Sequence, residues 1–212
     1  MPDPTLRELS RRAIRQRLGD VAIRIFAERG YAATTVDEVA AAAGISERTF
    51  FRYFGTKDQV LFFRADEDTQ MLVDRLRERP VGEAPWISLR QIVLVSLDLL
   101  DDEAELERER MLRSILNSTP ELLAHQLARV ADTQRTLGDA LWERWIAVPG
   151  HREDDADTRL VLRALVGAML GVLTEVMMHA EDQPPAERRR LVRTALDAIR
   201  PGRVDLGGEP DA

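Results

Sequence analysis

The sequence predicts an all-α protein of about nine helices. Apolar residues recur at intervals of three and four through most of its 212 positions, which is the period of a helix buried along one side. The strict alternation of apolar and polar residues that marks half-buried strands is missing. The residues that separate the periodic stretches are helix breakers, at Gly30, Gly44, Gly55, Pro80, Gly82 and Pro149.

Composition and charge divide the chain into two parts. The absence of cysteine excludes disulfides and cysteine nucleophiles and is typical of cytosolic proteins. No targeting segment is recognisable, and the most apolar run, residues 164–174, is too short to span a bilayer. Residues 1–57 carry ten Lys+Arg against seven Asp+Glu, net +3, whereas residues 58–212 carry twenty against thirty, net −10. We therefore expect a basic module that binds nucleic acid, joined to an acidic domain with another task.

The first predicted helix runs from Leu6 or Leu9 to Arg29. One side of it is apolar, and basic residues are concentrated at its front. These arginines can follow a phosphate backbone, reach a minor groove or form a solvated face, and the sequence leaves the three alternatives open. The apolar stripe is Ile14, Leu18, Val21, Ala22, Ile25 and Phe26, and the arginines are Arg7, Arg11, Arg12, Arg15 and Arg17.

Two short helices joined by a tight turn are predicted next. Thr35 and Glu38 have the spacing of a capping box, in which each side chain satisfies a free backbone N–H of the first turn. Gly44 ends this helix, because the residue after a helix usually has a positive φ and glycine adopts that conformation at little cost. Ser46 caps the second helix, residues 47–54, and Gly55 closes it. This pattern is typical of a helix-turn-helix DNA-binding motif.

The second short helix has an inner and an outer side. At 100° per residue, Phe50 and Phe54 share the inner side, while arginines that can bond guanine edges share the outer one. Free N–H groups at helix N-termini favour phosphates, which adds contacts at the two neighbouring helix starts. The predicted DNA contacts are Thr34, Thr35, Ser46, Arg48, Thr49, Phe51, Arg52, Tyr53 and Lys57.

Three segments carry a resemblance to a known family. They are FAERGYAATTVDEVA (residues 26–40), AGISERTFFRYF (43–54) and GTK (55–57), and residues 18–61 as a whole resemble the N-terminal domain of TetR/AcrR bacterial transcriptional regulators. The resemblance implies a three-helix DNA-binding domain over residues 1–57. Phe51 departs from the pattern, because this position is most often tyrosine in the family, so a hydroxyl contact is replaced by van der Waals contact.

The remainder is predicted to be helical, with a helical domain over residues 58–200 and a disordered tail over 201–212. A helix opened by Thr56 and Gln59 continues to about Arg79 and connects the two domains. Thr119, Pro120 and Glu121 give a strong start signal for a long helix. The further helices are expected at residues 85–100, 104–117, 119–147, 155–180 and 185–199.

The helix expected at residues 155–180 is apolar on nearly every side, so it must be covered on nearly every side. A strip of small residues along it would let another helix approach closely. We therefore expect a homodimer formed by the last two helices, as the family resemblance also implies; a single-chain helical core is the alternative. The predicted interface residues are Ala164, Gly167, Ala168, Gly171, Leu191 and Ala195.

The family resemblance further implies a pocket for a small-molecule effector in the second domain. From Met111 onward the chain resembles the C-terminal domain of mycofactocin-type regulators, which implies an acyl thioester or similar amphipathic ligand. Methionines and aromatic residues at helical spacing are equally typical of a plain core. The candidate lining residues are Arg90, Val93, Leu97, Met111, Arg113, Ile115, Trp142, Met169, Leu173 and Glu175.

Enzyme signals are missing from the sequence. The three histidines have no metal-like spacing, and there is no glycine-rich phosphate loop and no nucleophile elbow. We therefore expect no catalysis, no metal and no cofactor. The predicted protein is a cytoplasmic, dimeric repressor that binds a double-stranded DNA operator and is released by a small ligand, with no membrane partner. A DNA-binding architectural protein without an effector and a helical protein-interaction adaptor are the alternatives.

Overall fold

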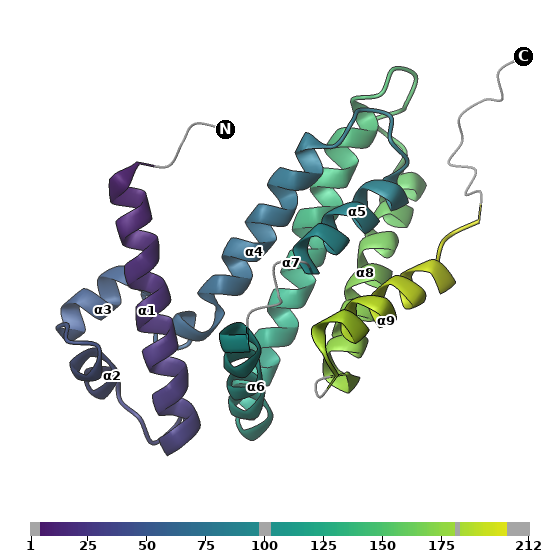
Figure 1. Cartoon of the computed structure of the whole chain (residues 1–212). Helices are drawn as coiled ribbons and strands as arrows, with labels where there is room; N and C mark the ends of the chain where they lie inside the picture. Colours follow the sequence, from purple (N-terminus) through teal and green to yellow (C-terminus); the bar gives the residue numbers. More distant parts are fainter. Residues whose placement is uncertain (1–4, 98–102, 181–182, 203–212) are drawn as a thin grey trace, which may run out of the picture. The chain divides into compact units, whose positions relative to one another are not determined.

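The computed structural model describes residues 5–97, 103–180 and 183–202, and these residues form nine helices and no strand (Figure 1). The predicted all-α fold is confirmed. Residues 98–100 of one predicted helix, and the predicted tail from residue 203 onward, lie outside the described residues. The helices are α1 (Leu6–Arg29), α2 (Val36–Ala42), α3 (Glu47–Tyr53), α4 (Gln59–Glu78), α5 (Pro85–Leu97), α6 (Glu103–Ser118), α7 (Pro120–Ile146), α8 (Ala156–His179) and α9 (Pro185–Ala198).

The chain forms two compact units, each with its own hydrophobic core. The first unit consists of Met1–Asp68 with Glu103–Leu127, and the second of Thr69–Asp102 with Ala128–Ala212. The helices α4 and α7 each contribute residues to both. The first unit therefore contains the predicted DNA module together with α6, which packs against α1.

The core of the first unit is aromatic. Phe26, Phe50, Phe54 and Phe63 are each at most 1% exposed, and the Phe50 and Phe63 rings both lie within 5.4 Å of the Phe54 ring, centroid to centroid. Gly19 of α1 lies against the Phe63 ring so closely that an added Cβ would stand 2.4 Å from a ring carbon. The four aromatic side chains thus hold α1, α3 and the start of α4 together, and they leave no room for a larger residue at position 19.

Ion pairs join α1, α4 and α6 inside the first unit. Arg108 of α6 is only 5% exposed, and its Nη1 lies 3.2 Å from Glu105 and 3.4 Å from Glu109. Arg64 of α4 pairs with Asp20 of α1 at 2.9 Å and also with Glu105. Since removing charges from water is expensive, such pairs specify one docking of α6 more than they stabilise it.

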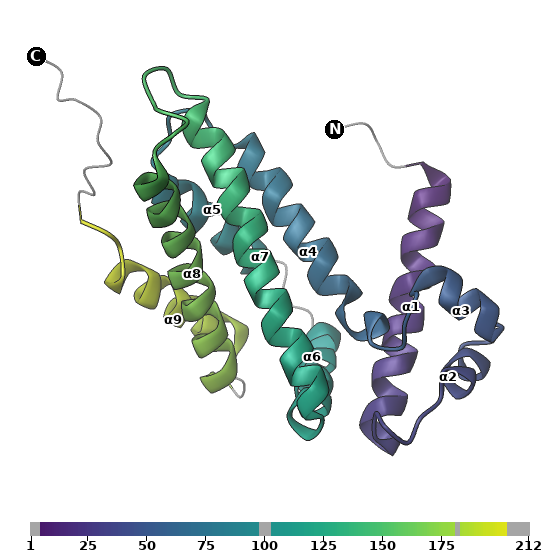
Figure 2. The same ribbon diagram turned by 180° about the vertical axis from the view of Figure 1, so that it is seen from behind.

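The core of the second unit is formed by the end of α4 together with α5, α7, α8 and α9. Figure 2 shows α7 and α8 side by side, and the approach is close because two glycines lie between them. An added Cβ would stand 2.7 Å from the Arg163 side chain at Gly138 and 2.5 Å from the Gln134 side chain at Gly167. Gln134 also donates to the Arg163 carbonyl at 3.1 Å. Gly167, predicted as a dimer contact, therefore serves packing within the chain.

The predicted helix starts are largely as expected. Thr35 and Glu38 form the capping box, Ser46 caps α3, and Gly44 has φ +71° in the turn between α2 and α3. One start differs: α4 begins at Gln59, whose N–H donates to the Thr56 hydroxyl at 3.3 Å. Lys57 therefore lies in a turn before α4 and not in its first helical turn.

The helix α8 is longer than the apolar run of residues 164–174 that the sequence analysis judges too short to span a bilayer. By length and composition alone, α8 is the one helix in the described part of the chain that could cross a membrane. Core helices of soluble proteins can have the same length and composition, so this one helix is weak evidence for a membrane.

Candidate nucleic-acid interface

The turn between α2 and α3 sets the angle between the two short helices. The N–H of Ile45 returns to the Ala40 carbonyl at 3.0 Å, and the N–H of Thr49 donates to the Ser46 hydroxyl at 3.2 Å. The Ser46 and Thr49 hydroxyls also bond each other at 2.9 Å. These local bonds fix the start of α3 before any nucleic acid is present.

The helix α3 has the predicted inner and outer sides. Phe50 and Phe54 are 0% and 1% exposed, whereas Arg48, Arg52 and Phe51 are exposed, Phe51 by 42%. The Phe51 ring stands edge-on against Phe50 at 5.7 Å, so the outer ring is held by the core below it. This surface offers two guanidinium groups for guanine edges and one apolar ring for a thymine methyl.

Thr49 and Tyr53 lie at the border of this surface, where both are half-buried. The Arg52 guanidinium lies 5.5 Å from the centre of the Tyr53 ring, and this cation–π contact restricts it to one side of α3. A side chain that is already positioned loses less entropy on binding. Arg52 is therefore the better oriented of the two outward arginines.

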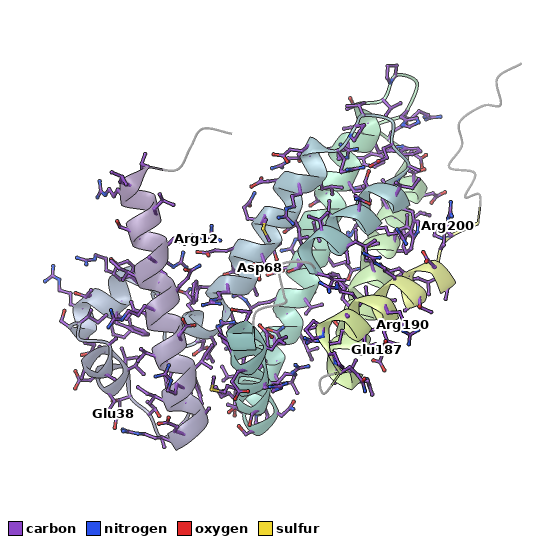
Figure 3. All side chains as sticks on the ribbon, viewed as in Figure 1. Arg12, Glu38, Asp68, Glu187, Arg190 and Arg200 are labelled. Atoms are coloured by element: carbon purple, nitrogen blue, oxygen red, sulfur yellow. The ribbon has the colours of Figure 1, made fainter. Side chains whose placement is uncertain are left out.

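Thr35, a predicted phosphate contact, is exposed, but its polar groups are engaged by Glu38. The Glu38 carboxylate accepts from the Thr35 N–H at 2.7 Å and from its hydroxyl at 3.0 Å (Figure 3 labels Glu38 at the start of α2). These bonds, first of all the one from the backbone, lower the pKa of Glu38. A phosphate at this helix start would meet a carboxylate already in place.

Thr34 does not present its side chain for DNA contact. It is 2% exposed, and its hydroxyl donates to the Gly30 carbonyl at 2.9 Å. The predicted phosphate contact is corrected on this point, because a buried hydroxyl that closes the turn after α1 is not available to a ligand.

Lys57 also differs from the prediction. Its ammonium donates to the Tyr31 carbonyl and lies 4.0 Å from the centre of the Tyr31 ring and 5.3 Å from that of Phe26. Burial lowers the pKa of Lys57, while Asp58 and Glu38 act in the opposite direction. The ammonium thus ties the loop after α1 to the turn before α4.

Sequence reasoning missed the partners of this link. The Tyr31 hydroxyl donates to the Asp58 carboxylate, and His125 of α7 lies 3.0 Å from the other Asp58 oxygen. Burial, and then Asp58, raise the pKa of Tyr31. Tyr31 and Lys57 lie in the quoted motifs, which could have marked them as interacting, but their separation of 26 residues hides the contact from a local pattern.

Two family models match the chain. Residues 18–62 match the model of bacterial regulatory proteins of the tetR family. Residues 83–204, more than half of the chain, match the model of the MftR C-terminal domain. The chain belongs to the TetR family. It is accordingly a DNA-binding transcriptional regulator, and the residues before 18 lie outside both matches.

Two curated relatives span most of this TetR-family chain. The putative mycofactocin biosynthesis transcriptional regulator MftR of Mycobacterium tuberculosis is 27% identical over 87% of this chain and 88% of its own length. The transcriptional regulator TcmR of Streptomyces glaucescens is 28% identical over 93% and 88%. Among solved structures, SmeT bound to triclosan has a TM-score of 0.56 at 23% identity, covering 94% of this chain and 98% of its own. SmeT is the repressor of the multidrug efflux pump SmeDEF of Stenotrophomonas maltophilia, and this likeness shows the shared fold.

The effector-pocket candidates of this TetR-family regulator are divided between the two units. Val93, Leu97, Trp142 and Met169 are buried in the core of the second unit, with Leu173 packed against it. Arg90 forms an ion pair with Asp197 at 3.0 Å, and Glu175 is exposed. The remaining three belong to the first unit, where Met111, Arg113 and Ile115 lie on α6.

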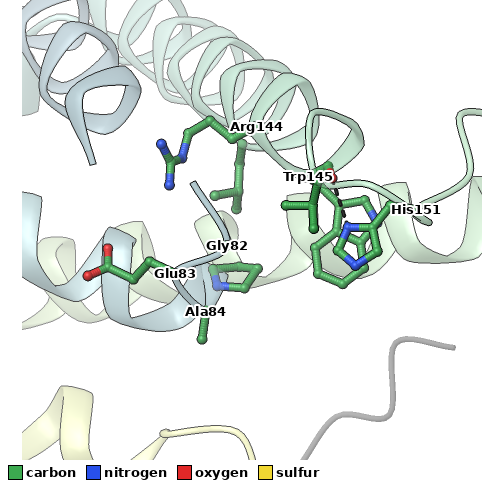
Figure 4. Close-up of a pocket in the computed structure, with 9 residues that line it drawn as sticks. Gly82, Glu83, Ala84, Arg144, Trp145 and His151 are labelled. Carbon is green, nitrogen blue, oxygen red and sulfur yellow. Dashed lines mark hydrogen bonds between the residues drawn. The ribbon is translucent and has the colours of Figure 1, made fainter. Parts of the chain in front are cut away.

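A pocket of about 60 Å³ does open in the second unit, beside the turn between α4 and α5 (Figure 4). None of the effector-pocket candidates lines it. His151 stacks on Trp145 at 3.7 Å, and Arg144 donates to the Arg79 and Pro80 carbonyls at 2.6 and 2.7 Å. The Arg144 guanidinium therefore already binds the backbone after α4, and the His151 ring already packs on Trp145. We interpret the pocket as a gap beside this turn.

The dimer candidates are placed on α8 and α9 as predicted, but with different exposure. Ala164, Ala168 and Gly171 are exposed, whereas Leu191 and Ala195 are half-buried at the border of the second core. Gly167 contacts Gln134 within the chain, as described above. Dimerisation and response to a ligand are typical of TetR-family regulators.

Proposed function

We propose that this regulator is a homodimeric repressor that reads a pseudo-palindromic operator with α3 and leaves it when a small amphipathic molecule binds. The observation that carries the proposal is the outer side of α3. Arg48, Phe51 and Arg52 are exposed together, while Phe50 and Phe54 anchor the helix in the core. An anchored helix with outward arginines fits a major groove and bonds guanine edges.

The dimer step of the proposal rests on the exposed side of α8. Leu160, Ala164, Ala168, Gly171 and Met178 follow one another at spacings of four, four, three and seven, so they share one side of the helix. All five are exposed, Leu160 by 67% and Met178 by 58%. A second copy of the chain would cover this apolar side. Two copies also bring two α3 helices to half-sites about one DNA turn apart.

The ligand step is supported by the composition of the second unit. Its core contains aliphatic, methionine and aromatic side chains, which suit an amphipathic molecule with a long apolar part. SmeT, which shares the fold, has been solved in complex with triclosan. By the match to the MftR C-terminal domain, we propose an acyl thioester or a molecule of similar character. The proposal assigns no catalysis and places the protein in the cytoplasm.

The DNA-binding part is tested by selecting sites from random duplexes with the purified full chain. We expect enriched sequences with two inverted half-sites, bound much more tightly than unselected DNA. Salt-sensitive binding without enrichment would instead support the architectural role. No DNA binding at all would support the adaptor role and refute the proposal.

The ligand part is tested by intrinsic fluorescence, because all three tryptophans lie in the second unit, as Trp86, Trp142 and Trp145. Titration with a long-chain acyl coenzyme A should change the emission and release the selected duplex over the same concentration range. Free coenzyme A is the control, because it lacks the apolar chain. If the thioester changes neither emission nor binding, this ligand class is wrong.

A further inference from the structure

The helix α1 extends well beyond the part of the chain that matches the family. It begins at Leu6, whereas the tetR-family match begins at residue 18. Figures 1 and 2 show the first turns of α1 running past α2 and α3, and further along these turns Arg12 and Arg15 reach Glu67 of α4. About three helical turns therefore form an arm, defined here as residues 6–17.

On the inner side of α1, apolar residues give way to arginines in the arm. Leu18 and Ala22, 2% and 0% exposed, pack into the core of the first unit. Steps of three and four residues lead backward along the same side to Arg15, Arg11 and Arg7. The stripe that is apolar inside the core thus becomes a row of arginines where α1 leaves it.

Arg15 shows where this row lies relative to the DNA-reading helix. Its guanidinium is 5.6 Å from the centre of the Phe54 ring and 5.2 Å from that of Phe63, and it pairs with Glu67 at 3.5 Å. Phe54 is the C-terminal cap residue of α3. The row of arginines therefore begins beside the end of α3 and points away from the core.

Arg7 and Arg11 differ from the arginines next to them. Arg12, which Figure 3 labels, pairs with Glu67 at 3.4 Å, as Arg15 does. Arg7 and Arg11 are exposed, and no hydrogen bond or ion pair joins them to another residue in the described part of the chain. Two exposed cations without a partner, one helical turn apart, suit the negative charge of a phosphate backbone.

We propose that the arm is a second DNA contact, in which Arg7 and Arg11 bind backbone phosphates flanking the groove that α3 enters. The inference rests on the proposed function, because it needs α3 to place the duplex. The arm adds affinity without base preference, since phosphates carry no sequence information. It also makes the bound site longer than the bases that α3 reads.

The experiment compares two double variants of the full chain on a selected site. Arg7→Gln/Arg11→Gln removes the two arginines of the row that have no partner. Arg17→Gln/Arg24→Gln removes two exposed arginines from another side of α1 with the same change in charge. Binding is measured between 50 and 200 mM salt, on a duplex with long flanks and on one trimmed to the half-sites. Circular dichroism checks that both variants are folded.

On the long duplex, each lost phosphate contact should lower the salt slope by about 0.9. A bound dimer of the arm variant lacks four such contacts, so it should lose about 150-fold less affinity across this salt range than the wild type. The control should keep the wild-type slope. On the trimmed duplex the arm variant and the wild type should bind alike, and preference between selected and random DNA should be unchanged.

Three results would overturn the inference. The first is an unchanged slope in the arm variant, and the second is an equal fall in the control, which would indicate net charge alone. The third is arm-dependent binding to phosphatidylglycerol vesicles with DNA binding unaffected, which would assign the arm to a membrane surface. A wild type that selects no DNA refutes the proposed function as well, whereas the first three results leave it standing.

Discussion

A single buried ring, Phe50, decides which side of α3 faces outward. It is 0% exposed, while its neighbour Phe51 is 42% exposed. We expect Phe50→Ala to lower the free energy of unfolding by about 3–5 kcal/mol, because it leaves a cavity in a close-packed core. Phe51→Ala is the matched control and should change stability by no more than about 0.5 kcal/mol. Urea denaturation measures both, and similar losses in the two variants would contradict the assignment of sides.

Arg48 and Arg52 are the side chains proposed to read bases. Replacing either by alanine should cost about 1–3 kcal/mol on the selected site and relax preference at one base position per half-site. The affinity for random DNA should fall much less. Competition binding with single-base variants of the site measures this. If discrimination between the selected site and random DNA survives in both variants, another surface reads the sequence.

At the residue scale, the sequence predicted which side of a helix a residue faces better than which residues it contacts. The two faces of α3 follow from helical periodicity, so Phe50, Arg48 and Arg52 could be placed without a structure. Thr34 and Lys57 could not, because their hydrogen-bond partners are set by the packing of α1 against the turn before α4. A polar residue at a helix start looks the same in sequence whether it faces a ligand or a neighbouring carbonyl.

At the scale of elements, the docking of α6 in the first unit should depend on pH. Desolvation is the largest cause that raises the pKa of Glu109 on α6 above its ordinary value, although its side chain is still 38% exposed. A carboxyl with a raised pKa in the folded state favours folding when protonated, so its contribution is present below the ordinary value of 4.5 for Glu109 and is lost as pH rises. The charged groups around Glu109 are Asp68, Glu105, Arg108 and Arg113.

Glu109→Gln should therefore gain stability relative to the wild type as pH rises from about 4.5 toward neutrality, because glutamine does not titrate. Thermal unfolding across this range gives the difference between the two proteins. Glu107→Gln, an exposed change on the same helix, should show no such trend. A difference that stays flat or falls with pH would contradict the role of burial.

Element boundaries were predictable where capping residues mark them. Thr35, Ser46 and Pro120 set helix starts within a residue or two of the prediction. The ion pair of Arg108 with Asp20 was not predictable, since the two residues are far apart in sequence. Nothing in the local sequence distinguishes Arg108 from the many arginines of this chain that are exposed. Local sequence patterns predict where the helices lie in the chain, whereas contacts between residues far apart in sequence determine how the helices pack.

At the scale of the whole molecule, the exposed side of α8 should control assembly. Ala168→Arg places a charge without a partner in the proposed interface, which costs on the order of 3–5 kcal/mol. We expect a folded monomer that binds one half-site normally and the full operator weakly. Ala128→Arg, on an exposed position of α7, is the matched control. Light scattering gives the oligomeric state, and a dimeric Ala168→Arg protein would refute this interface.

The division of labour between residues 1–57 and 58–200 stays a prediction. The compact units follow contacts, and they group Glu103–Leu127 with the first 68 residues. No local signal reveals this, because α6 reads as an ordinary amphipathic helix. The family resemblance predicted the order of the helices and the DNA-contacting helix α3. Which residues form each core depends on which apolar sides of the helices pack together, and the resemblance does not show this.

The link through Lys57 has a chemical consequence. Lys57 is the only lysine of the chain, and its amine is held by a carbonyl and two aromatic rings. Acylating reagents therefore have one side-chain target, which becomes reactive when the loop after α1 opens. The rate of acylation at Lys57 would report that opening with the chain otherwise intact. Lysine acetylation, which silences many basic surfaces in cells, has no target on the arginine face of α3.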